Sequence, residues 1–404
     1  MAKTILLIGT LDTKGAEFAY VRALIQARGH QVLMMDAGIL QDPRFEAEID
    51  AAEVAEAGGG SLAQLRQQAD RGMAVETMRQ GVIELALQLH SEGKIDGVLG
   101  LGGSGGTAIA TAAMRELPVG MPKVMVSTVA SGDTAPYVGV KDITMMYSVV
   151  DIAGLNRLSR QILANAAGAI CGMVEQAVPA AEDKPLLAAT MFGVTTPCVT
   201  AAREHLEAAG YELLIFHATG SGGQAMESLI EAGFIEGAAD ITTTEWCDEL
   251  VGGVLSAGPN RLEAAGRKGI PQVVSCGALD MVNFWAYDTV PAQFKDRNLY
   301  KHNANITLMR TTPEECAQLG RIIAEKLNQA TGPTALFIPL KGVSAIDAAG
   351  QPFHDIAADE ALFNALRQHV KPSVEVVELD MHINDPAFAL ALSERLLEML
   401  GETW

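Results

Sequence analysis

The sequence predicts an α/β protein with two Rossmann-like, doubly wound parallel-sheet subdomains that are related to each other as a repeat. Three observations support this prediction. Short apolar runs alternate with amphipathic segments along nearly the whole chain, as expected for parallel strands covered by helices on both faces. The 404 residues exceed what one hydrophobic core usually holds. A second series of the same elements starts after a linker-like stretch at 178–185.

The first half shows this alternation clearly. Apolar runs predict strands at Thr4–Ile8, Gln31–Met35, Gly97–Leu101 and Val124–Ser127. Amphipathic spacing predicts helices at Glu17–Arg28, Val75–Glu92, Gly105–Leu117 and Asp151–Gln176. Residues 39–73 interrupt the rhythm with an acidic stretch, three consecutive glycines and a polar helix that carries Arg66 and Arg71. We interpret this segment as an excursion from the fold or a flap.

The second half restarts the pattern and then extends it. Predicted strands and helices follow one another at Leu186–Met191, 200–209, Glu212–Phe216, His302–Arg310, Pro313–Gln329, Thr334–Pro339, Asp359–Val370, Val374–Leu379 and Pro386–Leu400. We expect the elements beyond residue 300 to extend the second sheet. Gly29–Val32 aligns with Gly210–Leu213 at an offset of 181 residues, and Met121–Ser127 resembles Ile270–Ser275. The alternative to a repeat is that two βα units share a generic pattern by chance.

These patterns place the domain boundary after residue 182. Residues 1–182 are predicted to form a nucleotide-binding subdomain, and residues 183–404 a second Rossmann-like subdomain with a C-terminal extension.

Composition excludes several functional classes. A formal charge of −20 repels phosphate backbones and anionic lipid surfaces, so neither nucleic acids nor membranes are expected partners. No apolar run approaches the ~20 residues that cross a bilayer. The five cysteines are widely spaced without a CxxC pair, which argues against a zinc site and suits a reducing compartment. No leader sequence precedes the first strand, so we expect a cytoplasmic protein. As a separate expectation, no residues are assigned as metal ligands.

The strongest motif is a glycine-rich loop between a strand and a helix. It comprises Gly102, Gly103, Ser104, Gly105, Gly106 and Thr107. Glycines let backbone N–H groups approach an anion, and the positive end of the helix dipole adds to the attraction, so the loop predicts a phosphate cradle. The alternative is a tight turn that needs small residues for packing. The loop is not a Walker A motif, and the missing GxGxxG with a downstream acid disfavours NAD.

Other loops at strand ends supply further candidate ligand contacts. The stretch Thr10, Asp12, Thr13 and Lys14 follows the first strand, where ligands bind in open α/β sheets. Lys14 would neutralise a phosphate and Asp12 would hold a ribose hydroxyl or a metal, whereas helix capping is the alternative role of Asp12 and Thr13. Further candidates are Asp36, for a ribose, and Ser127, Thr128 and Ser131, as a wall of the ligand site.

The second half contributes weaker signals. Thr219–Gly223 is a candidate second anion nest, with a plain turn as the alternative. Asp280, His302 and His382 are candidate acid–base residues because a carboxylate with an imidazole can transfer protons or hold a divalent ion. Their spacing does not establish that they meet, and a solvated loop is the alternative for each.

Five motifs together resemble a family of uncharacterised bacterial proteins that share the N-terminal ATP-binding domain of the tomato mosaic virus resistance protein. They are Gly9–Gly15, Gly102–Thr107, Asp151–Asn156, His302–Thr312 and Pro339–Asp347. The resemblance implies two Rossmann-like subdomains, ATP binding and a homodimer. The plant protein also carries a C-terminal barrel that resembles phosphoenolpyruvate-utilising enzymes. Because this chain ends before such a domain, a separate barrel protein of that type is a candidate partner.

Three functions follow from these observations. The first is a nucleotide-binding protein of small-molecule metabolism, with ATP and optionally Mg²⁺ as ligands and phosphates on the Gly102–Thr107 loop; ATP-dependent catalysis is one form of it. The second is a cleft enzyme, an isomerase or transferase, that acts on a phosphorylated or nucleotide-linked substrate without hydrolysing ATP. The third is a non-catalytic, nucleotide-responsive regulatory protein. The sequence leaves open whether the protein is an enzyme.

Overall fold

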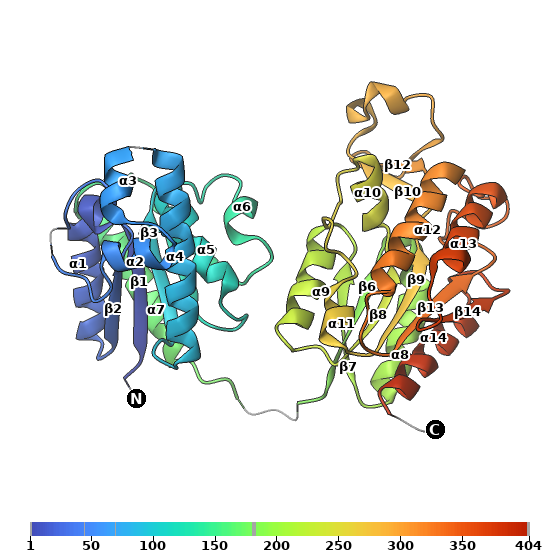
Figure 1. The fold of residues 1–404 in the computed structure, drawn as a ribbon, viewed down its shortest axis with the longest axis horizontal. Helices are drawn as coiled ribbons and strands as arrows, with labels where there is room; N and C mark the ends of the chain where they lie inside the picture. The colour runs from blue at the N-terminus through green and yellow to red at the C-terminus, as the bar shows by residue number, and fades with distance from the viewer. Residues whose placement is uncertain (1, 44, 69, 180–182, 402–404) are drawn as a thin grey trace. The chain divides into compact units, whose positions relative to one another are not determined.

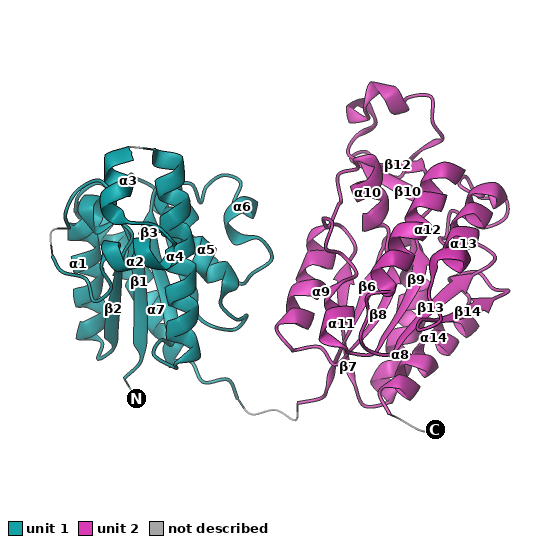
Figure 2. Ribbon diagram, viewed as in Figure 1, with its two compact units in different colours: residues 1–180 teal, residues 181–404 magenta. Residues whose placement is uncertain are grey.

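The structure, a computed structural model, describes residues 2–43, 45–68, 70–179 and 183–401. The chain divides into two compact units, residues 1–180 and 181–404 (Figure 2). The domain boundary predicted after residue 182 falls at residues 180–182, outside the described part of the chain. Each unit is an α/β domain and is described by itself.

Unit 1 contains a five-stranded, entirely parallel sheet in the order β2-β1-β3-β4-β5. The strands are β1 (Thr4–Gly9), β2 (Gln31–Asp36), β3 (Gly97–Gly102), β4 (Lys123–Ser127) and β5 (Thr144–Tyr147). The chain moves from β1 to β2 on one side and returns to β3 on the other side of β1. The strand order therefore reverses between β1 and β3, and such a switch point is where open α/β sheets form ligand crevices.

Helices cover both faces of this sheet, because side chains of β1 alternate between two cores. Ile5 and Leu7 pack in the core under α1 (Leu11–Ala27) and α7 (Arg157–Glu175). Leu6 and Ile8 belong to the opposite core. That core is closed by α2 (Ala51–Ala57), α4 (Arg71–Ser91) and α5 (Ser104–Glu116). The doubly wound architecture predicted from the sequence is confirmed.

The described residues of the predicted excursion at 39–73 belong to unit 1 and include helices. The excursion carries α2 and α3 (Leu62–Gln68) and leads into α4. An isolated parallel bridge joins Met35 to Ile49, and α2 packs against α4. The short helix α6 (Ala135–Val138) follows β4. Among the described residues, no helix is both long and apolar enough to cross a membrane.

Unit 2 repeats the topology of unit 1 with one added strand. Its six parallel strands lie in the order β14-β13-β9-β8-β6-β7. They are β6 (Leu186–Met191), β7 (Glu212–His217), β8 (Gly237–Thr242), β9 (Gln272–Gly277), β13 (Thr334–Pro339) and β14 (Glu375–Leu379). Counted from β6, the first five strands follow the same order as the five of unit 1. The predicted relation between the halves is confirmed at the level of topology.

The helices of unit 2 cover its sheet in the same manner (Figure 1). They are α8 (Thr196–Ala208), α9 (Ser221–Glu231), α10 (Glu245–Val251), α11 (Ala264–Lys268), α12 (Pro313–Leu327), α13 (Ile356–His369) and α14 (Pro386–Met399). Short 3₁₀ turns are η1 (Gly193–Thr195), η2 (Tyr287–Thr289) and η3 (Ala292–Phe294).

Two element predictions need correction. The stretch His302–Arg310 does not extend the parallel sheet. Instead β12 (Thr307–Arg310) pairs antiparallel with β10 (Met281–Phe284) and with β11 (Leu299–Lys301) in a separate three-stranded sheet. The helix predicted from Asp151 starts only at Arg157, because Asn156 caps it: the Asn156 side chain accepts the N–H groups of Leu158 and Ser159.

Candidate functional site

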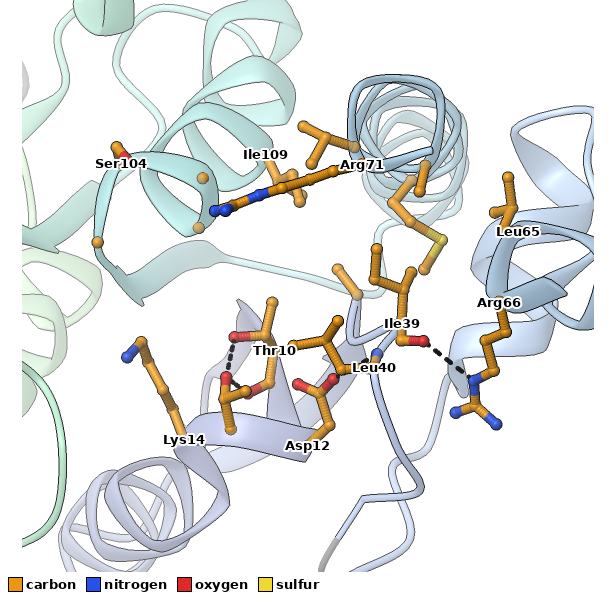
Figure 3. A pocket seen from close by; sticks show the side chains of 18 of the residues that line it. Thr10, Asp12, Lys14, Ile39, Leu40, Leu65, Arg66, Arg71, Ser104 and Ile109 are labelled. Atoms are coloured by element: carbon orange, nitrogen blue, oxygen red, sulfur yellow. Dashed lines mark hydrogen bonds between the residues drawn. The ribbon is translucent and has the colours of Figure 1, made fainter. Parts of the chain in front are cut away.

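A pocket of about 520 Å³ lies at the carboxyl ends of β1, β2 and β3, at the switch point of unit 1 (Figure 3). Its walls come from the β1–α1 turn, the segment after β2, α3, the first turns of α4 and the glycine loop before α5. The residues of these five segments are far apart in sequence. The topology brings them together because parallel strands end at one edge of the sheet.

The glycine loop presents backbone donors to this pocket. Gly103, Ser104, Gly105 and Gly106 line it, and no side chain caps the start of α5. The first backbone hydrogen bond of α5 runs from the N–H of Thr107 to the carbonyl oxygen of Gly103, at 2.8 Å. Within the described residues, the four preceding N–H groups have no acceptor. Such an uncapped helix start attracts anions through its N–H groups and its dipole.

Gly102 and Gly105 differ in the space that a side chain would find around them. A Cβ at Gly102 would lie 2.8 Å from the Cα of Gly106, so the tight turn requires glycine there. A Cβ at Gly105 would meet no atom within 4 Å. Because Gly105 lines the pocket, a side chain at this position would occupy space that is otherwise available to a ligand.

Three basic side chains line the pocket, and they differ in what they bind. Arg66 donates to the carboxylate of Asp42 at 3.0 Å, and Lys14 donates to the carbonyl of Ile152 at 2.6 Å. Arg71, at the start of α4, reaches towards the glycine loop (Figure 3) and has no hydrogen bond or ion pair with any described residue. Arg71 is therefore the cation that is available to a ligand.

Two carboxylates predicted to contact a ligand have separate roles. Asp12 lines the pocket and is only 2% exposed; its Oδ2 accepts the N–H of Leu40 at 2.8 Å, whereas its Oδ1 has no partner. Asp36 lies outside the pocket lining, and its Oδ1 accepts the N–H groups of Leu11 and Gly38. Burial raises the pKa of Asp36, although these two hydrogen bonds act to lower it. Asp36 thus holds the β1–α1 turn in place.

The remaining predicted contacts of unit 1 are distributed around the site. Thr10 and Thr13 line the pocket and bond to each other through their hydroxyls at 2.9 Å. Thr107 is buried and bonds to the hydroxyl of Ser127 at 2.7 Å, which ties the loop after β4 to α5. The Oγ1 of Thr128 lies 3.7 Å from the position of a Cβ at Gly103, and Ser131 is exposed beyond the pocket lining.

Unit 2 contains the same four-residue helix start, but it is already occupied. Gly220, Ser221, Gly222 and Gly223 open α9 as Gly103–Gly106 open α5. The N–H groups of Gly220 and Gly223 donate to Oε1 of the buried Glu245 at 2.7 and 3.0 Å. The guanidinium of Arg261 donates to the other oxygen of that carboxylate at 2.7 Å. The N–H groups at Thr219–Gly223 thus do bind an anion, as predicted, but that anion is the protein's own Glu245 carboxylate.

The backbone at the two helix starts differs in one respect. Gly220 has a φ of +85°, whereas Gly103 has a φ of −80°. The shared feature is a Gly-Ser-Gly-Gly helix start without a side-chain cap, next to an arginine.

The three acid–base candidates of unit 2 do not form one group. Asp280 is fully buried; it accepts a hydrogen bond from Oγ of Ser344 at 2.7 Å, and burial raises its pKa to about 6. Nε2 of His382 lies 2.8 Å from the carbonyl oxygen of the same Ser344. His302 is exposed between β11 and β12, and no described side chain bonds to its imidazole. Asp280 and His382 are thus connected through Ser344, whereas His302 contacts neither of them through a hydrogen bond.

One cluster in unit 2 has the composition of a metal site. Asp347, His354 and Asp359 each place one ligand atom within 4.8 Å of the others. The guanidinium of Arg310 already pairs with Asp347 at 3.4 Å and with Asp359 at 2.7 Å. A buried arginine therefore supplies the positive charge that a metal ion would supply, and we assign the cluster a structural role.

Sequence reasoning missed Arg71 as a site residue. It recognised Arg71 only as part of a polar helix in the excursion. The available signal was its position: the excursion leaves the end of β2, and its basic residues return to the edge of the sheet where the glycine loop lies.

Comparisons with known proteins identify relatives along the whole chain. The model described as "Uncharacterised protein family (UPF0261) N-terminal domain" matches residues 3–179, and the corresponding C-terminal domain model matches residues 184–400. The "UPF0261 protein" of Clostridium tetani is 57% identical and covers 99% of this chain and 100% of its own length. The "ToMV resistance protein Tm-1(GCR237)" of Solanum lycopersicum is 45% identical over 81% of this chain and 45% of that protein. The predicted membership of an uncharacterised bacterial family with a tomato relative is thereby confirmed, whereas ATP binding stays a prediction.

Solved structures add only a general likeness of fold. The crystal structure of MurG from Acinetobacter baumannii is 13% identical and covers 99% of this chain and 93% of its own, with a TM-score of 0.22. A similarity this low carries no argument about function.

Proposed function

The chain belongs to the uncharacterised protein family UPF0261, and we propose that it binds a nucleotide, with ATP as the first candidate, in the pocket of unit 1. The phosphates would lie on the N–H groups of Gly103–Gly106, opposite Arg71. The remainder of the ligand would extend towards the apolar wall formed by Ile39, Leu65, Met78 and Ile109.

One observation carries this proposal: two positive features face one pocket without an anion between them. The uncapped start of α5 and the unpaired Arg71 both line the cavity. In unit 2, an equivalent Gly-Ser-Gly-Gly start and Arg261 hold the carboxylate of Glu245 between them. The molecule thus contains an example of how this helix start and an arginine share an anion. In unit 1 no described side chain fills that place, which supports an external phosphate.

The other end of the pocket favours a nucleotide over a free phosphate. Ligand pockets are mostly apolar with a few polar groups that fix orientation, and about 520 Å³ lies within their usual range of volumes. The polar backbone groups beside the apolar wall are already engaged: the carbonyl of Ile39 accepts from Arg66, and the N–H of Leu40 donates to Asp12. This wall therefore suits the flat face of a base.

Mg²⁺ is a candidate companion of the nucleotide. The phosphates would supply most of its ligands, as is usual for Mg²⁺ in nucleotide sites. Within the described chain, clusters of three or more ligating side chains are confined to Asp347, His354 and Asp359 of unit 2. When bound, Mg²⁺ would offset phosphate charge. The residues of the pocket would orient the nucleotide through the glycine amides and Arg71.

A thermal-shift panel tests the proposal. Melting of the wild type is recorded with ATP, ADP, GTP, NAD and sugar phosphates, with and without Mg²⁺. We expect ATP to raise the melting temperature, because a specific ligand at 100 times its Kd adds about 2.7 kcal/mol of stability. Gly105→Val should abolish the shift by filling the cradle. The matched control is Gly172→Val in α7, an exposed helical glycine whose Cβ would also meet no atom within 4 Å.

A missing response to every nucleotide in the wild type would refute the proposal. An equal shift in wild type and Gly105→Val would place the ligand elsewhere.

The other hypotheses remain predictions. A product assay with bound nucleotide separates ATP-dependent catalysis from a regulatory role without turnover. The homodimer, the cytoplasmic location and a separate barrel protein as partner are expectations that follow from the sequence and its resemblance.

A further inference from the structure

We propose that Asp12 accepts a hydrogen bond from a ribose hydroxyl of the ligand, so that a nucleotide lacking that hydroxyl binds more weakly. The inference rests on the proposed nucleotide site and adds what that site recognises. It assigns one of the two roles open to Asp12, a hydroxyl acceptor rather than a metal ligand.

The first argument is an unsatisfied atom. Asp12 is 2% exposed, and its Oδ2 is fixed by the N–H of Leu40 at 2.8 Å. Its Oδ1 is buried and has no hydrogen-bond partner in the part of the chain that the structure describes. Leaving a buried polar atom without a partner is costly, particularly for a charged group. Because Asp12 also lines the pocket, a donor on the ligand is the partner that the fold leaves to be supplied.

The second argument is the order of the strands. Asp12 follows β1, the apolar residues Ile39 and Leu40 follow β2, and the glycine loop follows β3. In the sheet β1 lies between β2 and β3. A ligand that extends from the glycine loop to the apolar wall therefore crosses the end of β1. In a nucleotide, the ribose is the group that lies between phosphate and base.

The third argument is that the surroundings of Asp12 leave room for its carboxylate. A Cβ at Gly38 would lie 2.6 Å from Cγ and 2.7 Å from Oδ1 of Asp12, so any other residue at position 38 would displace the carboxylate. The neighbouring acid, Asp36, has the opposite arrangement, since its Oδ1 is taken by the N–H groups of Leu11 and Gly38. Of these two acids, Asp12 is thus the one whose Oδ1 accepts no backbone N–H group among the described residues.

Electrostatics favour a hydroxyl over a metal ion at this atom. Lys14, Arg66 and Arg71 line the same pocket, and the positive end of α5 faces it. These positive groups disfavour a metal ion at Oδ1 of Asp12, and they would neutralise the charge of the bound phosphates. A hydroxyl donates a hydrogen bond without bringing a charge. In dinucleotide-binding Rossmann folds, a carboxylate accepts a hydrogen bond from the ribose 2′-hydroxyl in this way.

The test compares the affinities of ATP, 2′-deoxy-ATP and 3′-deoxy-ATP by calorimetry with Mg²⁺. For the wild type, we expect at least one deoxynucleotide to bind about tenfold or more weakly than ATP, since hydrogen bonds to charged groups are among the strong ones. Asp12→Asn keeps an oxygen for Leu40 but replaces the charged acceptor at the other position by a neutral amide donor, so the preference for ATP should become smaller.

The matched control is Asp70→Asn. Asp70 lines the same pocket, and its carboxylate caps the N–H of Met73 at 3.0 Å, a role that asparagine performs equally well. This variant makes the same chemical change without altering Oδ1 of Asp12. The ratio of ATP to deoxynucleotide affinity should stay at the wild-type value.

Three outcomes would overturn the inference. Equal wild-type affinities for ATP and both deoxynucleotides exclude the hydroxyl contact without any variant; if Gly105→Val still abolishes binding of all three, the nucleotide site itself stands. A loss of Mg²⁺ dependence in Asp12→Asn, with no change in the sugar preference, assigns the residue to a metal instead. No binding of any nucleotide refutes this inference together with the proposed function.

Discussion

Arg71 is a candidate ligand contact because of the protein contacts that it lacks among the described residues. Arg66 and Lys14 line the same pocket, but each already donates to a protein oxygen. The guanidinium of Arg71 has no such partner within the described residues and reaches towards four unoccupied amides. An arginine at a helix start is held in place while its five donors remain available to bind phosphate in a bidentate manner.

We therefore predict that Arg71→Ala lowers ATP affinity by about tenfold or more, because charge-assisted hydrogen bonds contribute about 1.5–3 kcal/mol. Arg71→Lys should recover part of the loss, since a lysine restores the charge but not the bidentate geometry. Calorimetric titration measures the effect. The control is Arg79→Ala on the same helix, whose guanidinium pairs with the exposed Glu76. If Arg71→Ala binds ATP as tightly as this control, Arg71 has no role in the site.

Asp248 provides a pH-dependent test in unit 2. Burial raises its pKa to about 7, although the N–H groups of Asn283 and Leu255 donate to it and act to lower the pKa. Unfolded aspartate has a pKa of about 3.9, so the folded state binds the proton more tightly. The resulting stabilisation is fully present below about pH 4 and is lost as the pH rises through about 7.

We predict that urea unfolding shows unit 2 becoming less stable from pH 5 to pH 8, and that Asp248→Asn flattens this slope. The change of slope, rather than the stability at one pH, is the readout, because the amide also alters the hydrogen bonds. Identical slopes in the two proteins would show that Asp248 does not titrate in this window.

Residue roles were the least accessible from the sequence. Asp12 follows β1 and Asp36 is the last residue of the neighbouring β2, and both were predicted to contact a ligand. Their difference depends on which backbone N–H groups lie within reach, namely Leu40 for one and Leu11 with Gly38 for the other. Those distances depend on the tertiary fold, so spacing alone could not separate the two roles. Arg71 was missed for the same reason.

At the scale of elements, the starts of α5 and α9 form a natural comparison. Both helices begin with Gly-Ser-Gly-Gly. The carboxylate of Glu245 fills the start of α9 and is less than 2% exposed. Arg261 behind it is also buried and pairs with Asp240 and Glu227 in addition to Glu245. This network joins α9, α10 and β8 in one charged core.

We predict that Glu245→Ala destabilises unit 2 by about 3–5 kcal/mol, because it removes one partner of a buried ion pair. The Nε of Arg261 and the N–H groups of Gly220 and Gly223 would lose their acceptor, although Asp240 and Glu227 would still pair with Arg261. Removing one partner of an exposed pair should cost about 1 kcal/mol or less. Glu378→Ala, which breaks the exposed pair with Arg367, is therefore the control. Denaturant unfolding compares the two variants. A loss of similar size in both would mean that the buried network contributes no more than a surface pair.

The elements themselves were largely predictable. Buried parallel strands leave continuous apolar runs, so β1, β6 and β13 were found close to their observed ends. The capping box at Asn156 shortened the helix predicted from Asp151. The antiparallel sheet of β10, β11 and β12 was missed because a short apolar strand does not reveal which sheet it joins.

At the scale of the whole chain, the two units share one topology but differ at their switch points. In unit 1 the space between β1 and β3 opens into the pocket. In unit 2 the corresponding strands are β6 and β8, and there the hydroxyls of Thr195 and Thr242 bond to each other at 2.7 Å and are completely buried. The repeat was predictable from the offset between the halves. The asymmetry was not, because the glycine motif occurs in both.

The central claim is that a nucleotide lies on the glycine loop of unit 1. Hydrogen–deuterium exchange of the full chain, with and without ATP and Mg²⁺, tests it most directly. We predict slower exchange at the β1–α1 turn, the first turns of α4 and residues 103–107, no change in unit 2, and no protection in Gly105→Val. Protection confined to unit 2, or protection of the glycine loop that survives Gly105→Val, would contradict the account.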